Sequence, residues 1–68
     1  MVRLRSYMVL HEDTIESLAE YLGISRQTLS GRINGHTQFK MDEVMLIADK
    51  YKLKSNEIME IFFKEESH

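Results

Sequence analysis

The basic side chains of this sequence gather in one window that contains no carboxylate. From Tyr21 to Met41 there are 21 residues without Asp or Glu, and the basic side chains among them are Arg26, Arg32, His36 and Lys40. From residue 42 onward, the sequence contains seven carboxylates and only four lysines. A local excess of positive charge favours anions such as phosphate groups, even though the net charge of −2 is unusual for a nucleic-acid-binding domain. Chance clustering in a short chain is the competing interpretation.

The other reactive side chains form no recognisable catalytic or metal site. His11, His36 and His68 lack the spacing of a metal motif such as His-Glu-x-x-His, and no nucleophile, phosphate-loop or dinucleotide motif is present. The carboxylates show no recognisable acid/base pair, and 68 residues leave little room to enclose a substrate. We therefore expect no enzyme, no cofactor, no metal and no small-molecule ligand.

Length and composition indicate one small helical domain over residues 1–68. The chain has no cysteine, no proline and only three glycines, which favours helices and fits a reducing compartment. No apolar run approaches the roughly 20 residues that a membrane span needs, and the N-terminus lacks the apolar core of a signal peptide. We expect a cytoplasmic protein that has no contact with membranes.

Apolar residues recur at helical spacing in five segments, which predicts an all-α fold. The expected helices cover about 2–11, 15–21, 26–34 and 41–51, and a fifth begins at Ser55 or Asn56. Thr14 or Asp13 is expected to cap the second helix, because Asp13 and Glu16 have the spacing of a capping box. Ser25 is expected to cap the third. In the fifth helix, the residues expected to face inward are Ile58, Ile61 and Phe62.

The second and third of these helices meet the requirements of a helix-turn-helix over about residues 14–35. Such a unit joins two helices by a short turn containing glycine, and its second helix enters the DNA major groove. Ala19 is small enough to let the helices cross, and Gly23 tolerates the positive φ of the turn. Ile24 then fills the core, while Leu29 and Ile33 anchor the second helix. An ordinary pair of packed helices remains the alternative.

This unit resembles the helix-turn-helix of Cro and phage-repressor proteins, the xenobiotic-response-element family. The resemblance lies first in residues 14–36, TIESLAEYLGISRQTLSGRINGH. Residues 39–51, FKMDEVMLIADKY, resemble the fourth helix of that family. Residues 57–63, EIMEIFF, are similar to the fifth helix of small repressors from prophages of Gram-positive bacteria. The likeness covers about residues 3–63 and implies a five-helix, repressor-like DNA-binding domain.

The resemblance places base-reading positions at the start and on the solvent face of the third helix. Carried over one by one, they are Arg26, Gln27, Ser30 and Gly31. Arginine pairs bidentately with guanine and glutamine with adenine, so the first two have suitable chemistry. Gly31 departs from the family, because relatives often carry a long polar side chain there. The glycine either lets the helix approach the bases closely or reflects drift at an exposed position.

The resemblance also implies contacts to the DNA backbone from the start of the second helix and from the loop after the third. The residues at these positions are Thr14, Asn34, His36, Thr37, Gln38 and Lys40, with Arg32 nearby. Ser25 and Thr28 are suited to donate to a phosphate or to contact a thymine methyl group. Glu16 and Glu20 on the second helix would oppose DNA if they faced it.

The fifth helix carries more apolar residues than one buried face requires. Met59 and Phe63 remain as an i, i+4 pair, which either covers the end of the bundle or contributes to a dimer interface. Repressors of this kind bind palindromic half-sites, so we expect a weak homodimer on a pseudo-palindromic operator in double-stranded DNA. The expected function is a transcriptional regulator of phage or prophage origin. The alternative is an antitoxin or adaptor whose partner protein binds the C-terminal helix.

Overall fold

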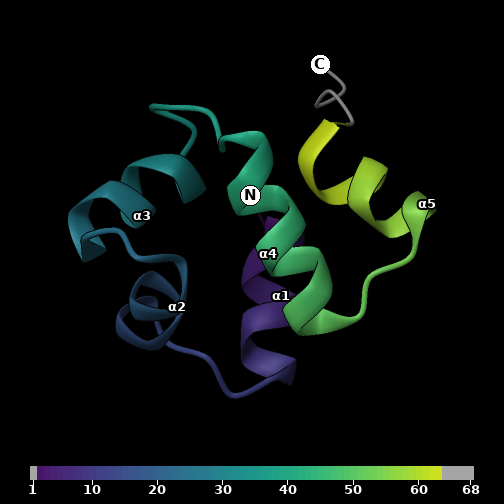
Figure 1. The fold of residues 1–68 in the computed structure, drawn as a ribbon, viewed down its shortest axis with the longest axis horizontal. Helices are drawn as coiled ribbons and strands as arrows, with labels where there is room; N and C mark the ends of the chain where they lie inside the picture. Colours follow the sequence, from purple (N-terminus) through teal and green to yellow (C-terminus); the bar gives the residue numbers. More distant parts are fainter. Residues whose placement is uncertain (1, 64–68) are drawn as a thin grey trace.

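The computed structural model describes residues 2–63, and over that range every regular element is helical. The elements are α1 (Val2–Leu10), α2 (Ile15–Leu22), α3 (Arg26–Ile33), α4 (Met41–Tyr51) and α5 (Ser55–Ile58), which continues into a π-helical turn, η1 (Met59–Phe63). Figure 1 shows α2 and α3 on one side of α4 and α5 on the other. The predicted five-helix, all-α fold is confirmed. The predicted ends of the first three helices are each wrong by one residue.

One face of each of α1 to α4, together with η1, forms the hydrophobic core. Its fully buried side chains are Leu4, Leu18, Leu29, Ile33 and Ile47. Leu18 and Ile47 belong to the apolar stripes of α2 and α4, and in these two helices the amphipathic pattern of the sequence determines which face turns inward. At the C-terminal end Ile61 is buried and Ile58 and Phe62 are half-buried. The ring of Phe62 packs edge-on against Phe39, with centroids 5.3 Å apart.

The cap of α2 differs in part from the expected one. Thr14 is the cap: its hydroxyl accepts from the Ser17 amide at 3.1 Å, and its own amide donates to the Ser17 hydroxyl at 2.9 Å. The capping box therefore pairs Thr14 with Ser17, and the expected pairing of Asp13 with Glu16 is wrong. The physical reason is that the Asp13 carboxylate has other partners. It accepts from the Ser17 hydroxyl at 2.7 Å and from the Tyr51 hydroxyl at 2.7 Å.

Asp13 fastens the connection between α1 and α2 to the end of α4. The Asp13 carboxylate accepts from Tyr51, and the Lys50 ammonium lies 3.4 Å from it. The Asp13 side chain is almost fully buried. Burial by itself would raise the pKa of Asp13, but the hydrogen bonds from Tyr51 and Ser17 and the charge of Lys50 together lower it below the ordinary value. Burial and the same contact with Asp13 raise the pKa of Tyr51. The imidazole of His11 stacks on the Tyr51 ring at 4.4 Å.

Candidate nucleic-acid interface

A tight turn joins α2 to α3 and determines how the two helices cross. Gly23 ends α2 with a φ of 74°, a conformation that only glycine adopts at low cost, and the next amide, that of Ile24, donates to Ala19 O at 3.0 Å. Ala19 is buried, and Ile24 packs half-buried against the core. The small residue, the glycine and the apolar residue after the turn therefore have the structural places that the sequence predicts for a helix-turn-helix.

Two fully buried anchors, Leu29 and Ile33, determine the rotation of α3 about its axis. Because these side chains point into the core, Arg26 and Gln27 are exposed on the outer face of the helix, and Ser30 and Gly31 are half-buried beside them. All four predicted base-reading residues therefore lie on accessible parts of one helix. Whether they contact bases stays a prediction.

The start of α3 is capped by hydrogen bonds between Ser25 and Thr28, two residues that we expect near DNA. The Ser25 hydroxyl accepts from the Thr28 amide at 3.0 Å, which confirms Ser25 as the cap, and it donates to the Thr28 hydroxyl at 2.8 Å. Both hydroxyl groups retain acceptor capacity, and Thr28 keeps its donor. The cap therefore holds α3 in place without using up the hydrogen-bonding groups of these two residues.

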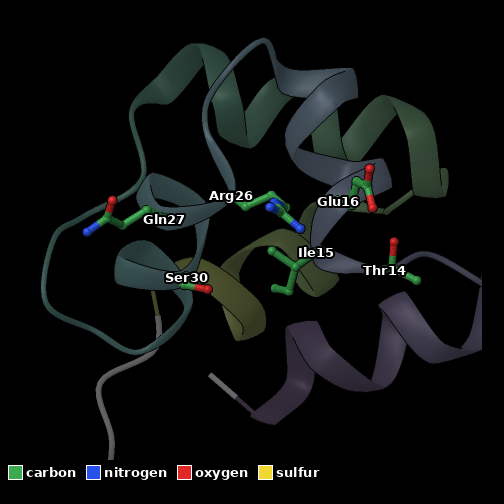
Figure 2. Close-up of a pocket in the computed structure, with 6 residues that line it drawn as sticks. All are labelled: Thr14, Ile15, Glu16, Arg26, Gln27 and Ser30. Carbon is green, nitrogen blue, oxygen red and sulfur yellow. The ribbon is translucent and has the colours of Figure 1, made fainter.

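A groove separates the start of α2 from the start of α3. It is lined by Thr14, Ile15 and Glu16 from the first and by Arg26, Gln27 and Ser30 from the second (Figure 2). The Arg26 side chain reaches from α3 towards α2, where Glu16 lies on the opposite wall, whereas Gln27 points the other way. The sequence left open which way Glu16 faces, and it gave no signal that Ile15 would line this groove.

Arg32 lies beneath the outer face of α3 in a nearly buried ion pair with Glu43 of α4. Its Nη2 donates to Glu43 Oε2 at 3.1 Å, and Nη1 donates to the Thr37 hydroxyl at 3.1 Å. Nε is 2.7 Å from Glu43 Oε1, close enough for an ion pair but not aligned as a hydrogen bond. The side chains are 11% and 5% exposed. This geometry favours a role in positioning the loop, and the expected phosphate contact of Arg32 stays a prediction.

The loop from residue 34 to residue 40 is attached to both neighbouring helices. The amides of His36 and Thr37 donate to Gly31 O, at 2.9 and 3.3 Å, and the Lys40 amide donates to Glu43 Oε1 at 2.9 Å. The loop residues expected to contact the DNA backbone are all exposed, namely Asn34, His36, Thr37, Gln38 and Lys40.

Asn34 already has a partner that the sequence did not indicate. Arg5 Nη2 of α1 donates to Asn34 Oδ1 at 2.9 Å. This contact spans 29 positions of the chain, so no local pattern of residues could have predicted it. It adds a guanidinium group to the edge of the loop.

The structure gives no internal reason for the glycine at position 31. A Cβ atom built there would meet only the Thr37 hydroxyl oxygen, at 3.8 Å, which is an ordinary contact, and the φ of Gly31 is not positive. Neither packing nor backbone conformation therefore requires a glycine. The two interpretations offered by the sequence, close approach of DNA and drift, both remain.

The two residues expected at a dimer interface lie on the outside of the C-terminal segment. Met59 is 57% exposed and Phe63 is 46% exposed. They therefore do not complete the core of the single chain. Whether a second copy covers them stays a prediction.

Residues 2–63 contain neither a membrane-spanning helix nor a metal site. No helix in this range is long and apolar enough to cross a membrane. No group of three His, Asp or Glu side chains there is arranged to hold a metal ion. Of the three histidines considered above, His68 lies outside the described residues.

Comparison with known proteins identifies a family. A family model described as helix-turn-helix matches residues 4–58, a range that begins within α1 and ends at the last residue of α5. No curated protein and no solved structure matches the chain. The match contains the whole groove between α2 and α3 and the loop that follows α3.

Proposed function

We propose that this chain, which belongs to the helix-turn-helix family of Cro/C1 type, binds a specific operator in double-stranded DNA and regulates transcription by occupying it. The family consists of DNA-binding regulators and not of enzymes. The observation that carries the proposal is the outer face of α3, where Arg26 and Gln27 are exposed on a helix oriented by Leu29 and Ile33. A phage or prophage origin, a Cro-like or short-repressor role and a cytoplasmic location complete the proposal.

In the proposed complex α3 lies in the major groove. Arg26 pairs with O6 and N7 of a guanine, and Gln27 pairs with N6 and N7 of an adenine, each contact contributing about 1–3 kcal/mol of discrimination. Ser30 and Gly31 lie behind them on the same face. Because Gly31 has no side chain, direct reading depends mainly on the first two residues and on the shape of the DNA.

Backbone contacts come from both ends of the unit. At one end Thr14 and the free amides of the first turn of α2 face a phosphate, with Ser25 and Thr28 at the start of α3. At the other end the exposed loop after α3 presents further donors, which are Asn34, His36, Thr37, Gln38 and Lys40. Such contacts give affinity and register but carry no sequence information. We place Arg32 behind this loop, where it holds Thr37.

We propose a weak homodimer in which Met59 and Phe63 meet their counterparts in a second copy. Two copies would then reach half-sites about one turn of DNA apart, roughly 34–36 Å. Sedimentation equilibrium should show reversible association that Phe63→Ser weakens. A chain that remains monomeric at millimolar concentration and on operator DNA would contradict the dimer. The alternative of an antitoxin or adaptor is not favoured, because the family to which the chain belongs binds DNA.

Fluorescence anisotropy with labelled DNA from the regulated promoter and with random DNA tests the proposal. Arg26→Ala and Gln27→Ala should lose discrimination at one base pair each and leave the fold intact. Lys40→Ala should weaken binding to all sequences and reduce the salt slope by about 1. Lys54→Ala removes the same charge at the cap of α5, a helix that lies on the other side of α4 from α2 and α3 (Figure 1). It should change neither the affinity nor the salt slope. Equal affinity for promoter and random DNA would refute the proposed function.

A further inference from the structure

An acidic side chain stands in the groove that should meet DNA. The window from residue 21 to residue 41 contains no carboxylate, yet the fold places Glu16 from outside that window on the wall opposite Arg26 (Figure 2). Both side chains are exposed, and within residues 2–63 no ion pair shorter than 4 Å joins them. Glu16 is therefore a carboxylate on the wall opposite Arg26 that forms no close ion pair within the described residues.

The neighbouring groups single out Arg26 as the cation on which Glu16 acts. Gln27 points away from the groove and is neutral, and the guanidinium of Arg32 is already paired with Glu43. The other lining residues, Thr14, Ile15 and Ser30, carry no charge. The groove thus contains one cation and one anion on facing walls.

A carboxylate in this place affects the two kinds of DNA contact differently. A phosphate approaching Arg26 also approaches Glu16. Two like charges 4 Å apart in water repel by about 1 kcal/mol, so this repulsion weakens binding by up to about fivefold. The O6 and N7 atoms of guanine carry no formal charge, so pairing of Arg26 with this base edge avoids most of that repulsion. The facing pair therefore favours a base over a phosphate as the partner of Arg26.

We infer that Glu16 is a specificity-determining residue. It directs the guanidinium of Arg26 to a base edge and lowers the affinity of Arg26 for phosphate. Arg26 then contributes more to discrimination between sequences than to general affinity. This inference rests on the proposed function, because it assigns a role within the same DNA-binding face.

Two matched variants test the inference. Glu16→Gln and Glu20→Gln each remove one negative charge from α2, both side chains are exposed, and Glu20 lies one turn further along, outside the groove lining. Binding to a random duplex and to the preferred sequence is measured by anisotropy at several salt concentrations. Thermal unfolding of both variants shows whether each is folded at the temperature used.

Glu16→Gln should raise the affinity for random DNA more than Glu20→Gln does, by up to about fivefold. It should steepen the salt slope by up to about 1, because Arg26 becomes free to contact a phosphate. The ratio of specific to random affinity should fall by a similar factor. In the Arg26→Ala background, the excess gain of Glu16→Gln over Glu20→Gln should shrink, and Glu16→Gln should no longer change the ratio of specific to random affinity.

Several results would overturn the inference. One is equal gains for the two variants, which would mean a general effect of net charge. Another is a gain from Glu16→Gln that leaves the specificity ratio unchanged, or one that is just as large in the Arg26→Ala background. These outcomes differ from failure of the proposed function, because that failure is visible in the wild-type protein alone as an absence of preference for any sequence.

Discussion

The ion pair between Arg32 and Glu43 offers the sharpest prediction about stability. Arg32→Met removes the cation and keeps most of the apolar stem, so it leaves the Glu43 carboxylate, only 5% exposed, without its positive partner. The Thr37 hydroxyl loses its donor in the same change. Loss of one partner of a buried ion pair typically costs about 3–5 kcal/mol, because the remaining charge is desolvated and uncompensated.

That cost is large for a domain of this size. At about 0.05–0.15 kcal/mol per residue, a chain of 68 residues has a total stability of roughly 3–10 kcal/mol. Arg32→Met should therefore remove from a third to all of the free energy of unfolding. The double variant Arg32→Met/Glu43→Met should be more stable than the single one, since it removes the unpaired charge, although the Lys40 amide then loses its acceptor.

Urea denaturation followed by circular dichroism at neutral pH measures this change. Arg5→Met is the matched control, because Arg5 also donates to a side chain, that of Asn34, but in an exposed contact. It should cost less than about 1 kcal/mol. If Arg32→Met costs no more than Arg5→Met, the ion pair is not effectively buried, and the positioning role given to Arg32 is refuted.

Three further changes have predictable effects on stability. Lys52 ends α4 with a φ of 56°, so Lys52→Gly should stabilise the domain by about 1 kcal/mol and raise its Tm by several degrees. Gly31→Ala should stabilise α3 by about 0.5–1 kcal/mol in urea denaturation, since its Cβ meets only Thr37; a loss of stability would contradict the packing described. Because the pKa of Asp13 is lowered, its contribution is present above its unfolded pKa of about 3.9 and is lost as pH falls through the folded value. Unfolding free energies between pH 5 and 2 should therefore fall less steeply for Asp13→Asn than for the wild type.

The helical elements and the scaffold of the unit were predictable because they depend on local patterns. The spacing of Leu18, Ala19 and Leu22 predicts both a helix and its buried face, and Gly23 marks a turn that only glycine makes cheaply. Such signals lie within four or five residues of one another. The accessible positions of Arg26 and Gln27 on α3 follow from the same periodicity, once Leu29 and Ile33 are recognised as the buried side.

Other features depend on contacts that no local pattern encodes. Asp13 has the spacing of a capping residue, but it turns instead to Tyr51, which is 38 positions away. From the sequence, Arg32 is expected to be one more cation near DNA, but in the structure α4 places Glu43 beside it. The orientation of Glu16 depends on the crossing angle of α2 and α3, which charge patterning alone does not determine. In each case the packing of the helices against one another, and not the local sequence, decided between two locally acceptable arrangements.

Selection of bound sequences from a random DNA pool tests the central claim most directly. If α3 reads bases through Arg26 and Gln27, the wild-type protein should enrich a defined sequence. Its half-sites should recur about 10–10.5 base pairs apart, and Arg26→Ala should lose the preference at a G·C pair within each half-site. A folded wild-type protein that enriches no sequence, or an enriched sequence that Arg26→Ala and Gln27→Ala leave unchanged, would contradict the account.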